Sequence, residues 1–133
     1  MDRRSDLKAA TLKIFHHHLH ELAKGLRPLA MMTLTVEEAV LVVGELVASV
    51  TPHHVQWACR DEVDVVFGRP AAVATARLLL ERRLCDLTDE QDFMLGILLG
   101  YDREQQCLRY LSRVEAAAVK RAAEIETSVG VLH

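Results

Sequence analysis

A run of histidines, HHHLHE at residues 16–21, is the densest group of potential metal ligands in the sequence. Imidazole nitrogens bind zinc and haem iron. If residues 14–22 form a strand, His16, His18 and His20 lie on one face about 7 Å apart, and a histidine of a neighbouring strand could complete a site. Bound haem or a divalent metal is therefore one hypothesis. The other is that the imidazoles form hydrogen bonds on a half-buried sheet or at a dimer interface, where charging them below about pH 6.5 would separate the subunits.

Two short segments carry cations that could hold an anion. The segment KGLRP, residues 24–28, combines a flexible glycine with Lys24 and Arg27, which could contact a phosphate or a partner's carboxylate. Arg69 lies between a glycine and a proline at the expected start of a helix, where free amides and the helix dipole favour negative charge. A simple turn is the alternative for both segments.

The segment DFMLGILLGYDREQQCLRYL, residues 92–111, raises the question of a catalytic cysteine. Cys107 lies several residues inside an expected helix and on its apolar stripe, which supplies neither a base nor a lowered pKa. Gln105, Arg109 and Tyr110 instead form a polar face, and arginine and tyrosine are enriched where partners bind. The pattern therefore predicts a partner-binding surface.

Motifs of the common enzyme classes are absent, including Gly-rich nucleotide loops, His-Glu-x-x-His and Gly-x-Ser-x-Gly. Asp89, Glu90 and Asp92 fit an acidic first helical turn better than a paired acid and base. We assign no catalytic residue.

The composition excludes several classes of protein. With 133 residues, 50% of them apolar and 26% charged, the chain suits one globular domain. The net charge of −3 and the scattered arginines provide no basic face for nucleic acid, and no apolar run is long enough to span a membrane. The 3 cysteines are far apart, which favours reduced thiols and a cytoplasmic protein.

Local signals place most of the elements that must position these residues. Thr35 and Glu38, and again Thr88 and Gln91, match capping boxes at helix starts. Gly100 suits a helix end because it readily adopts the left-handed conformation. The expected elements are a helix at 36–49, a β-hairpin at 53–59 and 63–68, a helix at 70–83, a helix from 88 to Gly100 with Phe93, Met94, Ile97 and Leu98 facing the core, and a long helix capped by Asp102 with a stripe of Cys107, Leu111, Val114, Ala118 and Ile125.

The N-terminal segment is ambiguous by pattern. Leu12, Phe15, Leu19, Leu22 and Leu26 recur at helical spacing, whereas a strand would align alternate histidines. The periodicity mildly favours a helix.

Three segments together resemble a small family of bacterial proteins of unknown function. They are IFHHHLHELAKGLRPL at 14–29, DVVFGRP at 64–70 and DEQDFMLGILLGYDREQQCLRYL at 89–111. The resemblance spans about residues 12–113 and leaves a C-terminal helical extension at 114–133. It implies an α+β fold with a small sheet of about three strands packed against about five helices, a homodimer, and a strand rather than a helix at the histidines. It also implies that some members are associated with flavodoxins.

Together these observations predict a single-domain, homodimeric binding or accessory protein without catalysis, acting near a flavodoxin-type electron-transfer system. The alternatives are a haem- or metal-binding protein of iron or haem metabolism, which would use the histidines, and a purely structural dimerisation module. The candidate binding residues are Lys24, Arg27, Arg69, Gln105, Arg109 and Tyr110; the candidate metal ligands are His16, His18 and His20.

Overall fold

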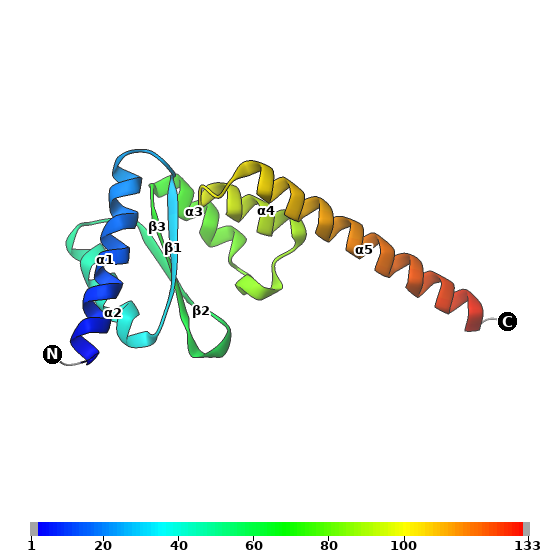
Figure 1. Cartoon of the computed structure of the whole chain (residues 1–133), viewed down its shortest axis with the longest axis horizontal. Coiled ribbons are helices and arrows are strands. Elements are labelled where there is room, and N and C mark those ends of the chain that lie inside the picture. The colour runs from blue at the N-terminus through cyan, green and yellow to red at the C-terminus, as the bar shows by residue number, and fades with distance from the viewer. Residues whose placement is uncertain (1–2, 132–133) are drawn as a thin grey trace.

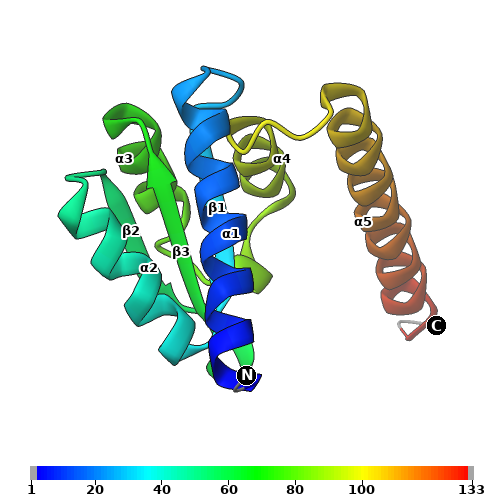
Figure 2. The ribbon, with the colours of Figure 1, turned by 60° about the vertical axis from the view of Figure 1, so that its left-hand side comes forward.

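The computed structural model, which describes residues 3–131, confirms the predicted α+β fold (Figure 1). A three-stranded antiparallel sheet has the order β1-β3-β2, and helices cover both of its faces (Figure 2). The elements are α1 (Arg3–Ala23), β1 (Leu29–Leu34), α2 (Val36–Ala48), β2 (His53–Trp57), η1 (Cys59–Asp61), β3 (Val63–Gly68), α3 (Pro70–Leu79), η2 (Leu84–Asp86), α4 (Asp89–Leu98) and α5 (Arg103–Val131), where η denotes a short 3-10 helix.

Strand β3 is the centre of the fold because it pairs with β1 along one edge and β2 along the other. Successive side chains of a strand point to opposite faces. Val65 and Phe67 are therefore buried with α1 and α2, whereas Val66 is buried with α3 and α4. Both faces of β3 lie in a core, which explains why its sequence is almost continuously apolar.

The N-terminal histidines lie on a helix, so the strand expected at 14–22 is wrong. Helix α1 buries Phe15 completely, and its ring lies 5.2 Å from that of Phe67 between centroids. Leu12, Leu19 and Leu22 pack against the same core. A stripe at helical spacing can bury these side chains together on one face, which alternation along a strand could not do.

Strand β1, which was not expected from the sequence, takes the place in the sheet of the strand expected at residues 14–22. Its register places Met32 opposite Val65 and Leu29 opposite Gly68. The predicted hairpin of β2 and β3 is confirmed, with Val55 opposite Val65.

The predicted helix starts are confirmed. Thr35 and Glu38 form a reciprocal capping box on α2, and the Oγ1 atom of buried Thr11 donates to Glu38 Oε2 at 2.6 Å. This bond from α1, followed by the cap, keeps the pKa of Glu38 below its usual value. Thr88 and Gln91 form the second capping box, at the start of α4.

The last two helices differ from expectation in detail. Helix α4 directs Leu95 and Leu99 into the core, while Met94 is 47% exposed. Helix α5 begins after Asp102, whose carboxylate accepts from the Gln105 amide at 2.9 Å, and it extends far beyond the sheet (Figure 1). The predicted stripe of α5 is not a core face, since Leu111 remains 60% exposed.

Two other expectations can be compared with the described residues. None of their helices combines the length and the apolar character needed to cross a membrane. Cys85 is disulfide-bonded, which corrects the expectation that the thiols are reduced, whereas Cys107 is a free and exposed thiol. The separation of cysteines along the chain does not show whether they form a disulfide, because folding determines which sulfur atoms come into contact.

Gly68 should be intolerant of any side chain. Its φ is +150°, and a Cβ atom there would lie 2.3 Å from the Pro28 carbonyl oxygen. We expect Gly68→Ala to lower the free energy of unfolding by at least about 2 kcal/mol, measured by urea denaturation. Gly44→Ala is the matched control, because a Cβ atom at this position in α2 would meet no atom within 4 Å. It should stabilise the protein by about 0.5–1 kcal/mol, and equal effects at the two positions would contradict the structure.

Candidate binding sites

The two cation-bearing turns predicted from the sequence lie side by side. The amide of Arg69 donates to the Pro28 carbonyl at 3.0 Å, and Arg69 Nη2 lies 3.6 Å from the point where a Cβ atom on Gly25 would be. Lys24 and Arg69 are both exposed. These two residues form what we call the basic corner, which joins the end of α1 to the start of α3.

Arg27 belongs to the interior of this region rather than to its surface. Its side chain is only 11% exposed, and its guanidinium lies 3.5 Å from the Glu21 carboxylate. It also donates to the Leu99 carbonyl at 3.4 Å and to His18 Nδ1. Arg27 therefore connects α1 to the end of α4.

His18 is the histidine that contributes to packing. Its ring meets the edge of the Phe67 ring, 6.2 Å away between centroids. Burial, followed by the nearby Arg27 charge, holds the pKa of His18 below its ordinary value, although the Glu21 carboxylate opposes this shift. A ring nitrogen that accepts from a guanidinium must be unprotonated, so the neutral imidazole is the form that fits this site.

The remaining histidines of the run point elsewhere. His16, His17 and His20 are exposed on α1, and His17 Nε2 lies 2.8 Å from Glu21 Oε1. Among the side chains that the structure describes, His, Cys, Asp and Glu form no group of three that could hold a metal ion. The helix accounts for this result, since it turns His18 toward the sheet and away from its neighbours.

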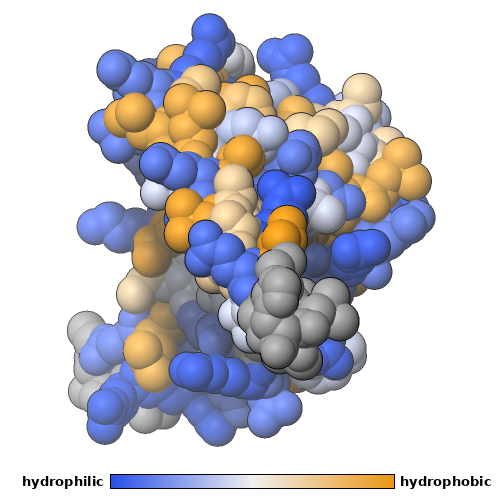
Figure 3. All heavy atoms as spheres, turned by 90° about the vertical axis from the view of Figure 1, so that its right-hand side faces the viewer, coloured by the Kyte–Doolittle hydropathy of each residue, from blue (hydrophilic) through white to orange (hydrophobic). Residues whose placement is uncertain are grey.

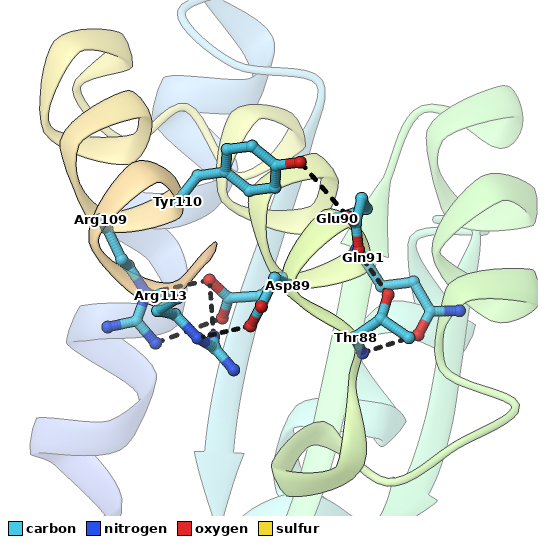
Figure 4. A network of polar contacts seen from close by, with 8 residues as sticks. Thr88, Asp89, Glu90, Gln91, Arg109, Tyr110 and Arg113 are labelled. Atoms are coloured by element: carbon cyan, nitrogen blue, oxygen red, sulfur yellow. Dashed lines mark hydrogen bonds and ion pairs between the residues drawn. The ribbon is translucent and has the colours of Figure 1, made fainter. Parts of the chain in front are cut away.

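Arg109 and Tyr110 take part in a network between α4 and α5 (Figure 4). Arg109 Nε donates to Asp92 Oδ2 at 2.9 Å, and Tyr110 donates to Glu90 at 3.2 Å. Arg113 contacts Asp89 at 2.9 Å and Asp92 at 3.1 Å. The hydrogen bond from Arg109 is the main cause of the lowered pKa of Asp92.

Two residues of the predicted partner-binding face make contacts within the protein through this network. Arg109 and Tyr110 hold α5 against the acidic first turn of α4, so much of their bonding capacity is used within the protein. Gln105 is exposed in the first turn of α5. Cys107 lies with Phe93 and Met94 along an apolar groove between the two helices.

Two features were missed from the sequence. Asp64, the second residue of β3, is 1% exposed, and it lines a cavity of about 530 Å³ between the sheet, α4 and α5. An acidic residue within the apolar run VDVVF was its one sequence signal.

The other missed feature is an apolar groove where β2 meets α2. Val40 is 68% exposed and Trp57 is 64% exposed in it, and Val55 also lines it. We call this the β2–α2 groove. Apolar side chains also reach the surface in several places on the face seen in Figure 3.

The family comparison covers most of the chain. Residues 13–113 match the family described as "Protein of unknown function (DUF2023)". The chain belongs to this family. The DUF2023 match includes the basic corner, the Asp64 cavity and the β2–α2 groove, and it ends within α5 at Arg113. A comparison with curated proteins finds no match.

The lowered pKa of His18 predicts a specific dependence of stability on pH. When the pH falls below the ordinary histidine pKa of 6.5, His18 binds a proton more readily in the unfolded chain than in the folded protein. The free energy of unfolding should therefore fall as the pH falls. We expect His18→Gln to make unfolding less sensitive to pH between about 7 and 5, because glutamine can accept from Arg27 and does not titrate. Thermal or urea unfolding measured across this range gives the slope.

His16→Gln is the matched control, since it removes an exposed imidazole from the same helix. Its pH profile should run parallel to that of the wild type. A wild-type slope retained in His18→Gln would mean that His18 is not the group responsible.

Proposed function

We propose that this protein is a non-catalytic, homodimeric accessory protein that binds an acidic surface of a flavodoxin-type electron-transfer protein. The observation that carries the proposal is that the exposed Arg69 side chain lies beside Gly25, the residue that follows exposed Lys24 in the chain. Two cations from separate turns offer a partner's carboxylates a preformed site, and such pairs guide association as well as binding.

The backbone of the basic corner is fixed without using its two charges. The Arg69 amide is bound to the Pro28 carbonyl, and the internal contacts beneath the corner are made by Arg27. Arg69 is also the N-cap residue of α3, whose first turn contains no acidic residue to offset the helix dipole. The positive end of α3 therefore adds to the attraction for an anionic partner.

The outer edge of β2 supports the homodimer. β2 lies at the edge of the described sheet, and its sequence HHVQW contains none of the lysine, proline or acidic residues that usually protect an exposed edge. Val40 and Val47 of α2 and Val55 and Trp57 of β2 expose apolar area beside it. A second copy pairing along β2 would cover both the edge and the β2–α2 groove by one self-complementary contact.

Val55→Lys should disrupt this dimer. The side chain of Val55 is 41% exposed on the edge strand, and a two-fold contact would bring two lysines together in an apolar interface. We expect the dimer dissociation constant to rise at least about tenfold, measured by sedimentation equilibrium.

Val119→Lys is the matched control, because Val119 is 65% exposed on the part of α5 beyond the family match. It should leave the dimer unchanged. Dissociation by Val119→Lys instead of Val55→Lys would place the interface on α5, and a monomeric wild type would exclude the dimer.

Charge reversal at the basic corner should weaken partner binding. Lys24→Glu with Arg69→Glu should lower the affinity for a flavodoxin from the same source at least about tenfold at low salt, measured by calorimetry. Wild-type binding should also weaken as salt is added. Lys120→Glu with Arg121→Glu makes the same change in net charge on distal α5 and should have little effect.

An equal loss with both double variants would indicate a response to net charge alone and would remove the basic corner from the proposal. Absence of binding by the wild type at low salt would reject the flavodoxin partner. Haem or metal binding is the alternative function, favoured by the exposed histidines one helical turn apart at His16 and His20. A stoichiometric haemin absorbance band lost in His16→Ala would favour it.

A further inference from the structure

We propose that the cavity above Asp64 binds a small organic cation, an amine or amidine carried on an apolar body. This is a separate site from the basic corner and the β2–α2 groove, and it does not depend on the function proposed for them. Asp64 supplies the acceptor, and apolar side chains supply much of the cavity wall.

The cavity is formed where the α3 and α4 face of the sheet meets the first turns of α5. Its volume is about 530 Å³, which is within the range of small-molecule pockets in proteins. Its apolar walls come from the sheet, η2, α4 and the turn before α5; they include Met31, Leu84, Leu95, Leu99 and Tyr101.

The carboxylate of Asp64 lies on this side of β3. Its neighbours Val63 and Val65 are buried against α1 and α2, so alternation along the strand directs Asp64 to the opposite face. Thr33 lies directly opposite on β1 and lines the same cavity, and its Oγ1 donates to Asp64 Oδ1 at 2.7 Å. This bond fixes the orientation of the carboxylate.

The second carboxylate oxygen is the unusual feature. Oδ2 of Asp64 is buried and has no hydrogen-bond partner among the described residues. A buried carboxylate oxygen without a donor is strongly unfavourable, and most buried polar groups are satisfied. A ligand N–H group in the cavity would satisfy it, and a cationic N–H would also balance its charge.

The other charged groups of the cavity favour a cation over an anion. Asp92 and Arg109 also line it, but they bond to each other at 2.9 Å. Of the two carboxylates that line the cavity, Asp64 is the one without an ion pair among the described residues. Gln106 can donate or accept at the same wall, so it can help orient a polar ligand without adding charge.

The close approach of α5 to α4 keeps this wall in place. A Cβ atom on Gly96 would lie 2.1 Å from Gln106 Oε1, so the absence of a side chain at Gly96 permits the glutamine to reach the cavity. The network of Arg109 and Arg113 with Asp92 holds the same pair of helices together. The cavity is therefore built from packed elements.

Benzamidine and benzamide provide a matched pair of probes, since they have similar shapes and differ in charge. In a titration followed by amide chemical shifts, benzamidine should cause saturable shifts at residues such as Thr33, Asp64 and Gln106. Benzamide should bind at least about tenfold more weakly. In Asp64→Asn the affinity for benzamidine should fall at least about tenfold, while Asp6→Asn, an exposed substitution on α1, should bind as the wild type does.

Equal affinity for the two probes would overturn the proposal, because it would show an apolar cavity that does not recognise charge. Benzamidine shifts confined to other residues, or unchanged affinity in Asp64→Asn, would also overturn it. The comparison of the two probes uses the wild-type protein alone, so it decides the question even if Asp64→Asn fails to fold. None of these outcomes alters the tests of the dimer or of the basic corner.

Discussion

The burial of β3 on both faces is the constraint on which the rest of the structure depends. Val65 and Phe67 require the cover of α1 and α2, and Val66 requires the cover of α3 and α4. A three-stranded sheet has little area of its own, so helices on each side supply the cores that stabilise it. Asp64 lies within this doubly covered strand, which makes its acceptor group both protected from water and available to a cavity.

Close backbone contacts then determine where charged side chains lie. The approach of Gly68 to Pro28 joins the turn after α1 to the turn before α3, and it brings Arg69 beside Gly25. Arg27 fills the interior of the same region through His18, Glu21 and the end of α4. Two similar cations close in sequence, Lys24 and Arg27, therefore have different environments, since Lys24 is exposed and the Arg27 side chain is mostly buried.

Helix α5 shows how the same residue types can serve stability instead of recognition. Arg109 and Tyr110 belong to the predicted partner-binding face, yet each contacts an acid in the first turn of α4, as Arg113 also does. Individual exposed ion pairs contribute little, but a shared network can hold two helices in register. The surfaces that we propose for partners are instead the β2–α2 groove, which exposes apolar area, and the basic corner, which exposes charge.

The resemblance to a family implied the α+β class, and the sequence by itself determined the hairpin and the helix caps at Thr35, Thr88 and Asp102, together with the stop at Gly100. These features depend on bonds or backbone angles within a few residues, so local residue types are sufficient to specify them. Tertiary structure alone decided that the histidines lie on a helix, that β1 completes the sheet, that Arg69 lies beside Gly25, and that Asp64 faces a cavity. Each of these outcomes depends on contacts between residues far apart in the chain, whose free energy is gained only when the cores on both faces of β3 have formed.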